Sequence, residues 1–182
     1  MKIQNYVILV SACSALLLCG CATDPARTEA LSDTPEILRP SKGETLAFTL
    51  KARGVQIYEC QARKNDAAQF EWTFKAPEAD LFDRAGRKVG THYKGPTWKS
   101  TDGSSVVGEK PRPYVKDTNA VPWLLMRAKQ NEGTGVFSKV TSIQRLHTVG
   151  GKALTGGCDS TTAGKEIRVP YTATYYFYVA KP

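Results

Sequence analysis

Apolar and polar residues alternate along much of the chain after residue 46, a pattern typical of β-strands. Residues 70–75 place three aromatic side chains on one face of a strand and polar side chains on the other. Residues 55–60 alternate less regularly but are rich in β-forming residues, and residues 168–179 predict a strong terminal strand. The continuous apolar run 121–126 predicts a strand buried on both faces, with Pro122 at its start or on a sheet edge.

Turn signals at residues 83–86 and 101–104 separate short strands and predict a meander of hairpins. Residues 136–149 carry apolar residues at a spacing of three, which also fits a helix, but their β-branched composition favours a strand. Short strands between regular turns predict one all-β domain over residues 41–182, an antiparallel β-sandwich or barrel-like fold. Tyrosines fall on both faces of the terminal strand, so we expect one face in the core and the other exposed.

The first 20 residues carry one lysine and then an apolar stretch too short to span a bilayer, which is typical of a secretion signal. The junction Leu18-Cys19-Gly20-Cys21 resembles a bacterial lipobox, which implies that Cys21 carries the lipid. The alternative is an ordinary secretory signal with a chance cysteine. Ala22 resembles the sorting signal for the outer membrane, facing the periplasm. Residues 21–40 are proline-containing and polar, so we expect a lipidated cysteine followed by a flexible tether.

Three of the five cysteines lie at or before residue 21, which leaves Cys60 and Cys158 in the folded part. Export implies an oxidising compartment, where two cysteines of a small domain are usually joined. We therefore predict a Cys60–Cys158 disulfide. The alternative, a pair of metal-binding thiolates, lacks the close C-x-x-C spacing of such sites.

The formal net charge is +8, and the signal segment contributes only one lysine to it. The basic residues are scattered and form no run of five or six, so nucleic acid is not an expected partner. The charge fits either a solvated surface near an anionic membrane or attraction to lipid headgroups or an acidic ligand.

An ordered set of blocks resembles the domain of unknown function 3455 family. The blocks are residues 54–60, 90–98 with 102–104, 121–125, 156–158 and 168–173. The resemblance covers nearly the whole chain from about residue 36. It implies a secreted or envelope domain with paired cysteines, and it assigns no catalytic residue.

The densest group of functional side chains is His92, Tyr93 and Trp98, followed by Asp102. A bend at Gly95 would let these four line a ligand pocket, with the aromatic rings stacking on a flat or sugar-like ligand. The alternative is structural: Tyr93 and Trp98 in the core, a hydrogen-bonded His92, and Asp102 in a hairpin turn.

No catalytic motif is present, and no histidine spacing supports a metal site or a cofactor. The sequence therefore favours a lipid-anchored envelope lipoprotein that binds a small or glycan-like ligand or another envelope component, with the membrane as a partner through the lipid on Cys21. Two alternatives stay open. One is a hydrolase of an envelope polymer using His92 and Asp102, and the other is a structural or assembly role.

Overall fold

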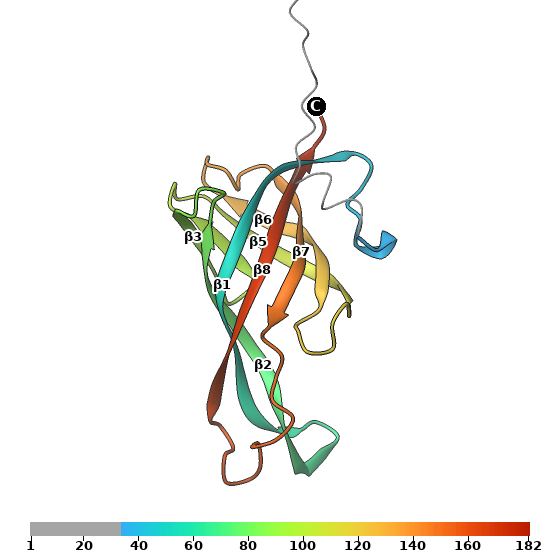
Figure 1. Ribbon diagram of the computed structural model, residues 1–182, viewed down its shortest axis with the longest axis vertical. Coiled ribbons are helices and arrows are strands. Elements are labelled where there is room, and N and C mark those ends of the chain that lie inside the picture. Colours follow the sequence, from blue (N-terminus) through green and yellow to red (C-terminus); the bar gives the residue numbers. More distant parts are fainter. Residues whose placement is uncertain (1–33) are drawn as a thin grey trace, which may run out of the picture.

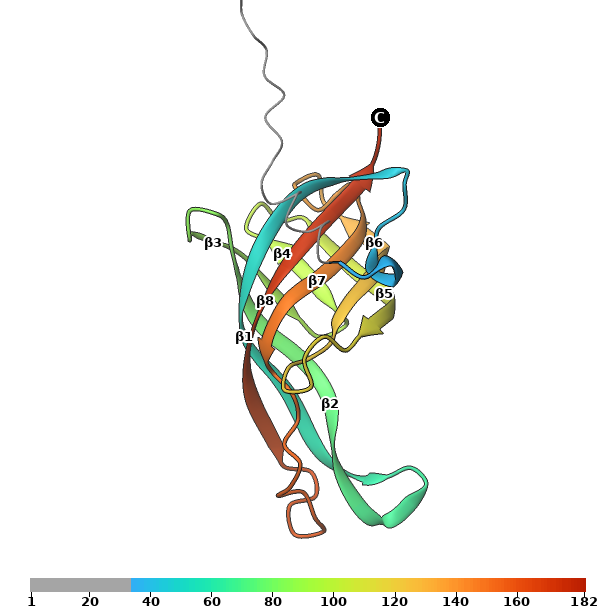
Figure 2. The same ribbon diagram turned by 45° about the vertical axis from the view of Figure 1, so that its right-hand side comes forward.

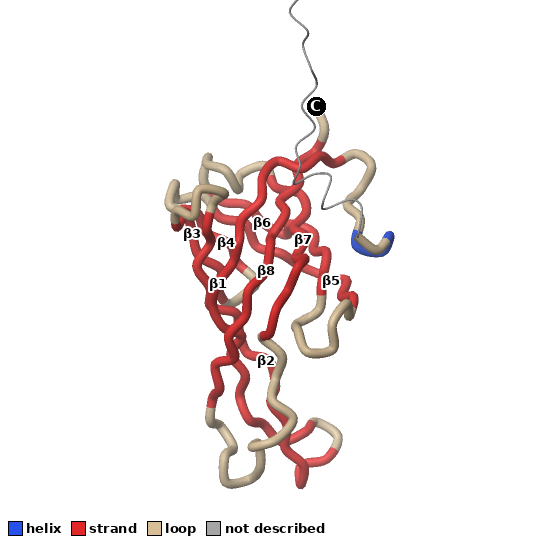
Figure 3. Tube along the Cα trace, in the orientation of Figure 1, coloured by secondary structure: helices blue, strands red, loops and turns tan. Residues whose placement is uncertain are grey.

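The computed structural model describes residues 34–182, so the predictions for the signal segment, for Cys21 and for the tether up to residue 33 lie outside the described residues. Strands make up most of residues 34–182, and the one helical element in this range is a single 3₁₀ turn (Figure 3). The elements are η1 (Glu36–Leu38), β1 (Glu44–Arg63), β2 (Asp66–Phe82), β3 (Lys88–Tyr93), β4 (Thr97–Ser100), β5 (Ser105–Tyr114), β6 (Trp123–Glu132), β7 (Val140–Gly150) and β8 (Glu166–Ala180).

Each strand pairs antiparallel with the next, and β8 pairs with β1 to close a barrel (Figure 1). Of the two all-β architectures that the sequence left open, the structure is thus the barrel. Both predicted hairpin turns are confirmed, since residues 83–86 join β2 to β3 and residues 101–104 join β4 to β5. Gly86 and Gly103 have φ values of 78° and 90°, which explains why each turn signal contains a glycine. The ambiguous segment 136–149 contributes strand β7.

The lower parts of β1, β2 and β8 extend beyond the barrel as a tapered projection, with the loop 151–165 beside them (Figure 2). The predicted disulfide is confirmed here: Cys60 of β1 and Cys158 of this loop are bonded, with a Cα–Cα distance of 5.4 Å. Between the projection and the barrel, the Tyr58 hydroxyl donates a 2.7 Å hydrogen bond to the Gly151 carbonyl. The disulfide therefore fixes the loop to a strand that runs on into the barrel wall.

Apolar side chains pack on both sides of the barrel wall at β8. Tyr171, Tyr175 and Phe177 point into the barrel, while Tyr176 and Tyr178 belong to a second apolar cluster on the outside. The expectation that this strand exposes tyrosines on one face is wrong, since all four tyrosines of β8 are buried. The outer cluster contains Leu38 of η1, whose side chain is fully buried.

The first described residues are part of the packed domain. Thr34 and Leu38 are buried, and the Gln144 side chain donates a 2.8 Å hydrogen bond to the Leu38 carbonyl. The Tyr178 hydroxyl donates to the Gln144 side chain in turn, at 2.9 Å. Residues 34–38 therefore differ from the tether predicted for them, because Leu38 covers apolar side chains that would otherwise face water. Among residues 34–182, no helix is long and apolar enough to cross a membrane.

Candidate functional site

Two of the predicted site residues lie in the barrel interior. His92 of β3 and Trp98 of β4 are directly opposite in register, and their rings stack at a centroid distance of 4.3 Å. His92 is 2 % exposed and Trp98 is 0 % exposed. The Tyr175 ring meets both edge-on, at 5.2 and 5.3 Å. These side chains are core packing. The structural interpretation of the sequence placed Trp98 in the core and gave His92 a hydrogen bond.

The protonation state of His92 follows from its surroundings. Burial, and to a smaller degree the charge of Arg145, lower the pKa of His92 to about 3, although a backbone hydrogen bond to Thr97 acts in the opposite direction. His92 Nδ1 lies 2.9 Å from the Thr97 carbonyl oxygen, so this nitrogen carries the proton and donates. A neutral, buried imidazole held in this way is poorly suited to act as an acid or base for an external substrate.

The other two predicted residues are exposed. Tyr93 lies at the end of β3 with 39 % of its surface accessible, which differs from the core position that the structural interpretation gave it. Asp102 lies in the turn between β4 and β5 and lines a cavity that contains none of the other three. The structure therefore does not bring His92, Tyr93, Trp98 and Asp102 together around one pocket, and no hydrogen bond among the described residues joins His92 to Asp102.

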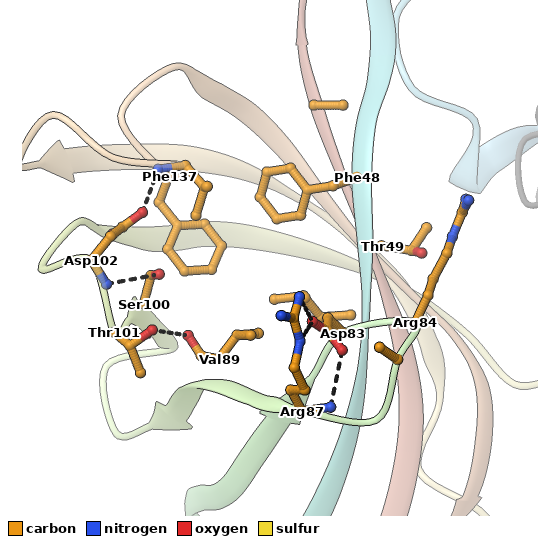
Figure 4. Close-up of a pocket in the computed structure, with 14 residues that line it drawn as sticks. Phe48, Thr49, Asp83, Arg84, Arg87, Val89, Ser100, Thr101, Asp102 and Phe137 are labelled. Carbon is orange, nitrogen blue, oxygen red and sulfur yellow. Dashed lines mark hydrogen bonds and ion pairs between the residues drawn. The ribbon is translucent and has the colours of Figure 1, made fainter.

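The cavity beside Asp102 has a volume of about 630 Å³ and is the candidate functional site (Figure 4). It lies between the upper part of β1 and three connections: the turn 83–87, the turn 101–104 and the loop 133–139. Its apolar lining residues are Ala47, Phe48, Leu50, Ala85, Val89, Val136 and Phe137, and its polar ones are Thr49, Asp83, Arg84, Arg87, Ser100, Thr101 and Asp102.

The opening exists because β1 is longer than its neighbour at this end. β1 pairs with β8 from Glu44 onward, whereas its pairing with β2 begins only at Lys51, opposite Phe82. Residues 44–50 therefore have a strand partner on one side only. The chain turns away into β3 at residue 83, and this leaves a gap in the barrel wall beside residues 47–50.

Aromatic rings form the inner wall of the cavity. Phe48 stacks on Phe177 at 4.8 Å and contacts Phe137 at 5.7 Å, and Phe137 contacts Phe177 at 5.0 Å. Phe48 and Phe137 come from opposite sides of the cavity and face each other in Figure 4. This cluster gives the site a rigid apolar surface with no polar group of its own.

Asp102 fixes the loop that carries Phe137. Its Oδ1 accepts hydrogen bonds from the Ser104 amide at 2.9 Å and the Ser104 hydroxyl at 2.6 Å, and its Oδ2 accepts one from the Val136 amide at 2.9 Å. The Ser104 Oγ accepts a further bond from the Phe137 amide at 3.2 Å. Hydrogen bonds from the Ser104 side chain, and then from the Val136 and Ser104 amides, lower the pKa of Asp102 to about 2.

Gly135 permits this contact, because a Cβ at that position would lie 2.2 Å from the Asp102 carboxylate. Asp102 is thus a positioning residue for the cavity wall.

Charged side chains surround the mouth. The Asp83 carboxylate accepts hydrogen bonds from the Arg87 amide at 2.9 Å and from Arg87 Nε at 2.8 Å, and these contacts lower the pKa of Asp83. The guanidinium of Arg84 points away from the Asp83–Arg87 pair in Figure 4. The mouth therefore combines a neutralised ion pair, a second arginine and the hydroxyls of Ser100 and Thr101 around an apolar interior.

Sequence reasoning missed Phe48 and Phe137. Phe48 lies in a run of alternating residues with no feature that distinguishes it from other strand residues. Phe137 follows two glycines, at positions 133 and 135, in a connection between strands. The sequence did contain a signal for the site, namely an aromatic residue in a glycine-containing loop and an aspartate in a separate turn. Residue type over a few positions does not reveal which turn packs against which loop, however.

No group of three or more His, Cys, Asp or Glu residues within residues 34–182 is placed to hold a metal ion. No curated protein and no solved structure matches the chain. Residues 40–179 match the family model described as a protein of unknown function (DUF3455), and the chain therefore belongs to that family.

Proposed function

We propose that this protein is a non-catalytic binding protein of the bacterial envelope that holds a small, largely apolar ligand in the cavity beside β1. The observation that carries the proposal is the cavity of about 630 Å³ with an aromatic inner wall and a polar, charged mouth. Ligand sites in proteins commonly have volumes of 300–1,000 Å³, apolar walls and a few polar groups that set orientation. The interior of this eight-stranded barrel is filled by side chains, so the ligand would lie at the gap in the wall and not at the centre of the barrel.

The chemistry of the walls favours one ligand class. Phe48, Leu50 and Phe137 offer apolar contact but no hydrogen bond, so a polyhydroxylated sugar would leave hydroxyl groups unpaired there. An apolar chain or ring system would instead gain about 25 cal/mol for each Å² that it buries. A polar end of the same ligand would lie at the mouth, near Arg87 and the hydroxyls of Ser100 and Thr101. A small apolar or amphipathic molecule fits better than a glycan.

The proposed location in the cell envelope rests on the sequence. A lipid on Cys21 would anchor the chain to a membrane, and Ala22 supports the outer membrane facing the periplasm. An apolar ligand and a lipid-anchored carrier are compatible, because such ligands dissolve in or derive from the same membrane. The confirmed disulfide is consistent with an oxidising compartment of this kind.

A fluorescent probe tests the cavity. The full chain carrying Cys21→Ser, which lacks the lipid attachment site, is titrated with N-phenyl-1-naphthylamine, a neutral apolar dye that fluoresces when it leaves water. We expect saturable binding. Ala85→Trp should weaken it at least tenfold, because this exposed residue lines the mouth and a larger side chain would fill it.

The matched control is Ala67→Trp, another exposed alanine, which lies at the start of β2 and does not line the cavity. It should bind the dye as the parent does. Equal dye affinity in the Ala85→Trp and parent proteins would reject the cavity as the binding site. Displacement of the dye by envelope lipid extract, followed by mass spectrometry, would then identify the natural ligand.

A further inference from the structure

A second hollow lies on the outer surface of the barrel wall formed by β1, β2 and β8. Two cavities of about 470 and 410 Å³ adjoin there and share Lys51, Phe82, Asp83, Arg84, His147 and Thr174. We call this the outer groove. It adjoins the first cavity and shares Thr49, Asp83 and Arg84 with it, but the apolar rings of that cavity do not line the groove.

The outer groove is positively charged. Lys51 and Arg53 stand two residues apart on β1, so both side chains leave the same face of the strand. The Arg53 guanidinium lies over the Phe82 ring at 5.6 Å, which orients it along the groove. Within residues 34–182, neither cation forms an ion pair with an acidic side chain. The one acid of the groove, Asp83, is already engaged by Arg87.

His147 provides an independent sign that something binds there. Its φ is +50°, a conformation that residues other than glycine and asparagine seldom adopt, and it lies where the β7–β8 register shifts. Its ring is held between Trp123 at 5.3 Å and Tyr176 at 6.3 Å. Its Nε2 is buried and has no hydrogen-bond partner. The side chain lines the groove, and its strained backbone and unpaired ring nitrogen call for an explanation that a bound ligand would supply.

We propose that the outer groove binds the phosphate group of a phosphate ester. Lys51 and Arg53 would neutralise its charge, and Arg53 offers the forked donor geometry that suits phosphate oxygens. The Thr174 hydroxyl would donate to a further oxygen. His147 Nε2 is itself buried, so the ring would have to turn outward to donate to another. Phosphate offers more acceptor oxygens than a carboxylate, which matches a site with several donors. The groove is also large enough to leave room for the substituent of the ester.

The phosphate could belong to a lipid headgroup or to a free solute, and the experiment separates the two. The full chain carrying Cys21→Ser is titrated at constant ionic strength with sodium phosphate and, separately, with glycerol 1-phosphate. The backbone amides of residues 51 and 53 and the His147 ring are followed by NMR. We expect saturable shifts at these positions. Tighter binding of glycerol 1-phosphate supports a headgroup, and equal affinity supports a free phosphate.

Substitutions of charged residues test whether phosphate binds in the groove. Lys51→Gln with Arg53→Gln should weaken phosphate binding at least tenfold. Lys99→Gln with Lys129→Gln removes the same charge at two exposed positions outside the groove and should change it less than twofold. An equal loss of phosphate affinity in both double variants would show that phosphate responds to the overall surface charge and not to the groove, and would overturn the proposal. Absence of saturable shifts with either probe would overturn it too.

A histidine variant tests the role of the strained residue. Asparagine tolerates a positive φ but is too short to place a donor where Nε2 lies, so His147→Asn should weaken phosphate binding several-fold with little change in melting temperature. Unchanged affinity in this variant would show that His147 is only structural, against the proposal. The proposal does not rest on the apolar cavity, since naphthylamine binding should be the same in all these variants.

Discussion

Replacing Asp102 by asparagine separates the two functions of its carboxylate without changing its shape. Oδ1 accepts a hydrogen bond from the Ser104 amide within the turn, and Oδ2 accepts one from the Val136 amide, 34 positions away. An asparagine has only one acceptor oxygen. We expect it to keep the local bond to Ser104, so that its NH₂ group faces the Val136 N–H and the long-range bond is lost.

The magnitude follows from the kind of bond and its exposure. A hydrogen bond to a charged group contributes about 1.5–3 kcal/mol, and solvent screening at an exposed residue such as Asp102 reduces this. We therefore expect Asp102→Asn to lower the free energy of unfolding by about 1–2 kcal/mol. Urea unfolding measures the loss. Hydrogen exchange at the Val136 and Phe137 amides should accelerate, because both depend on the Asp102–Ser104 pair.

The control is Asp117→Asn, since Asp117 accepts a 2.7 Å bond from the Asn119 amide within its own turn. The reasoning would be refuted if Asp102→Asn cost no more than this control and left exchange at Val136 unchanged. Protonation of Asp102 at low pH should lower the free energy of unfolding as the substitution does. The pKa of Asp102 is about 2 in the folded chain and about 4 when unfolded, so its contribution is complete above pH 4 and is lost as the pH falls towards 2.

Two further predictions concern the disulfide and the buried histidine. Replacing Cys60 and Cys158 by alanine should lower the free energy of unfolding in urea by about 4–5 kcal/mol, because the bond closes a loop with a sequence separation of 98; a loss below about 1 kcal/mol would contradict a chain-entropy origin. His92 has a folded pKa of about 3 against 6.5 when unfolded, so below pH 6.5 the unfolded chain binds a proton that the folded chain does not, and stability should fall by about 1 kcal/mol per pH unit. His92→Gln should flatten that slope between pH 6.5 and 4.5, and a slope equal to that of the parent would show that His92 is protonated in the folded state.

Local patterns accounted for the features that depend on neighbouring residues. The hairpin turns at 83–86 and 101–104 were predictable because glycine at positions 86 and 103 permits the positive φ that each turn needs. The strand at 168–179 was predictable from its composition. The disulfide was predictable because only Cys60 and Cys158 lie beyond the predicted secretion signal and its cleavage site.

The candidate site was only partly predictable. The sequence selected Asp102, which does line the cavity, but it grouped Asp102 with His92 and Trp98, which stack in the core. The grouping assumed that residues close in sequence converge. In a β-strand, successive side chains point to opposite faces, so Tyr93 is exposed while its neighbour His92 is buried. The long-range partner of Asp102 is instead the Val136 amide, which no local pattern connects to it.

The strands, the tight turns and the pair of cysteines follow from the sequence, because each depends on residue type over a few positions. The pairing of β8 with β1 that closes the barrel, and the covering of the outer tyrosines by Leu38, follow only from the packing of the folded chain. The same is true of the extension of β1 past the end of β2, which opens the cavity beside Phe48. These features depend on the register and length of strands that are far apart in the chain, which the summed packing of the whole domain selects.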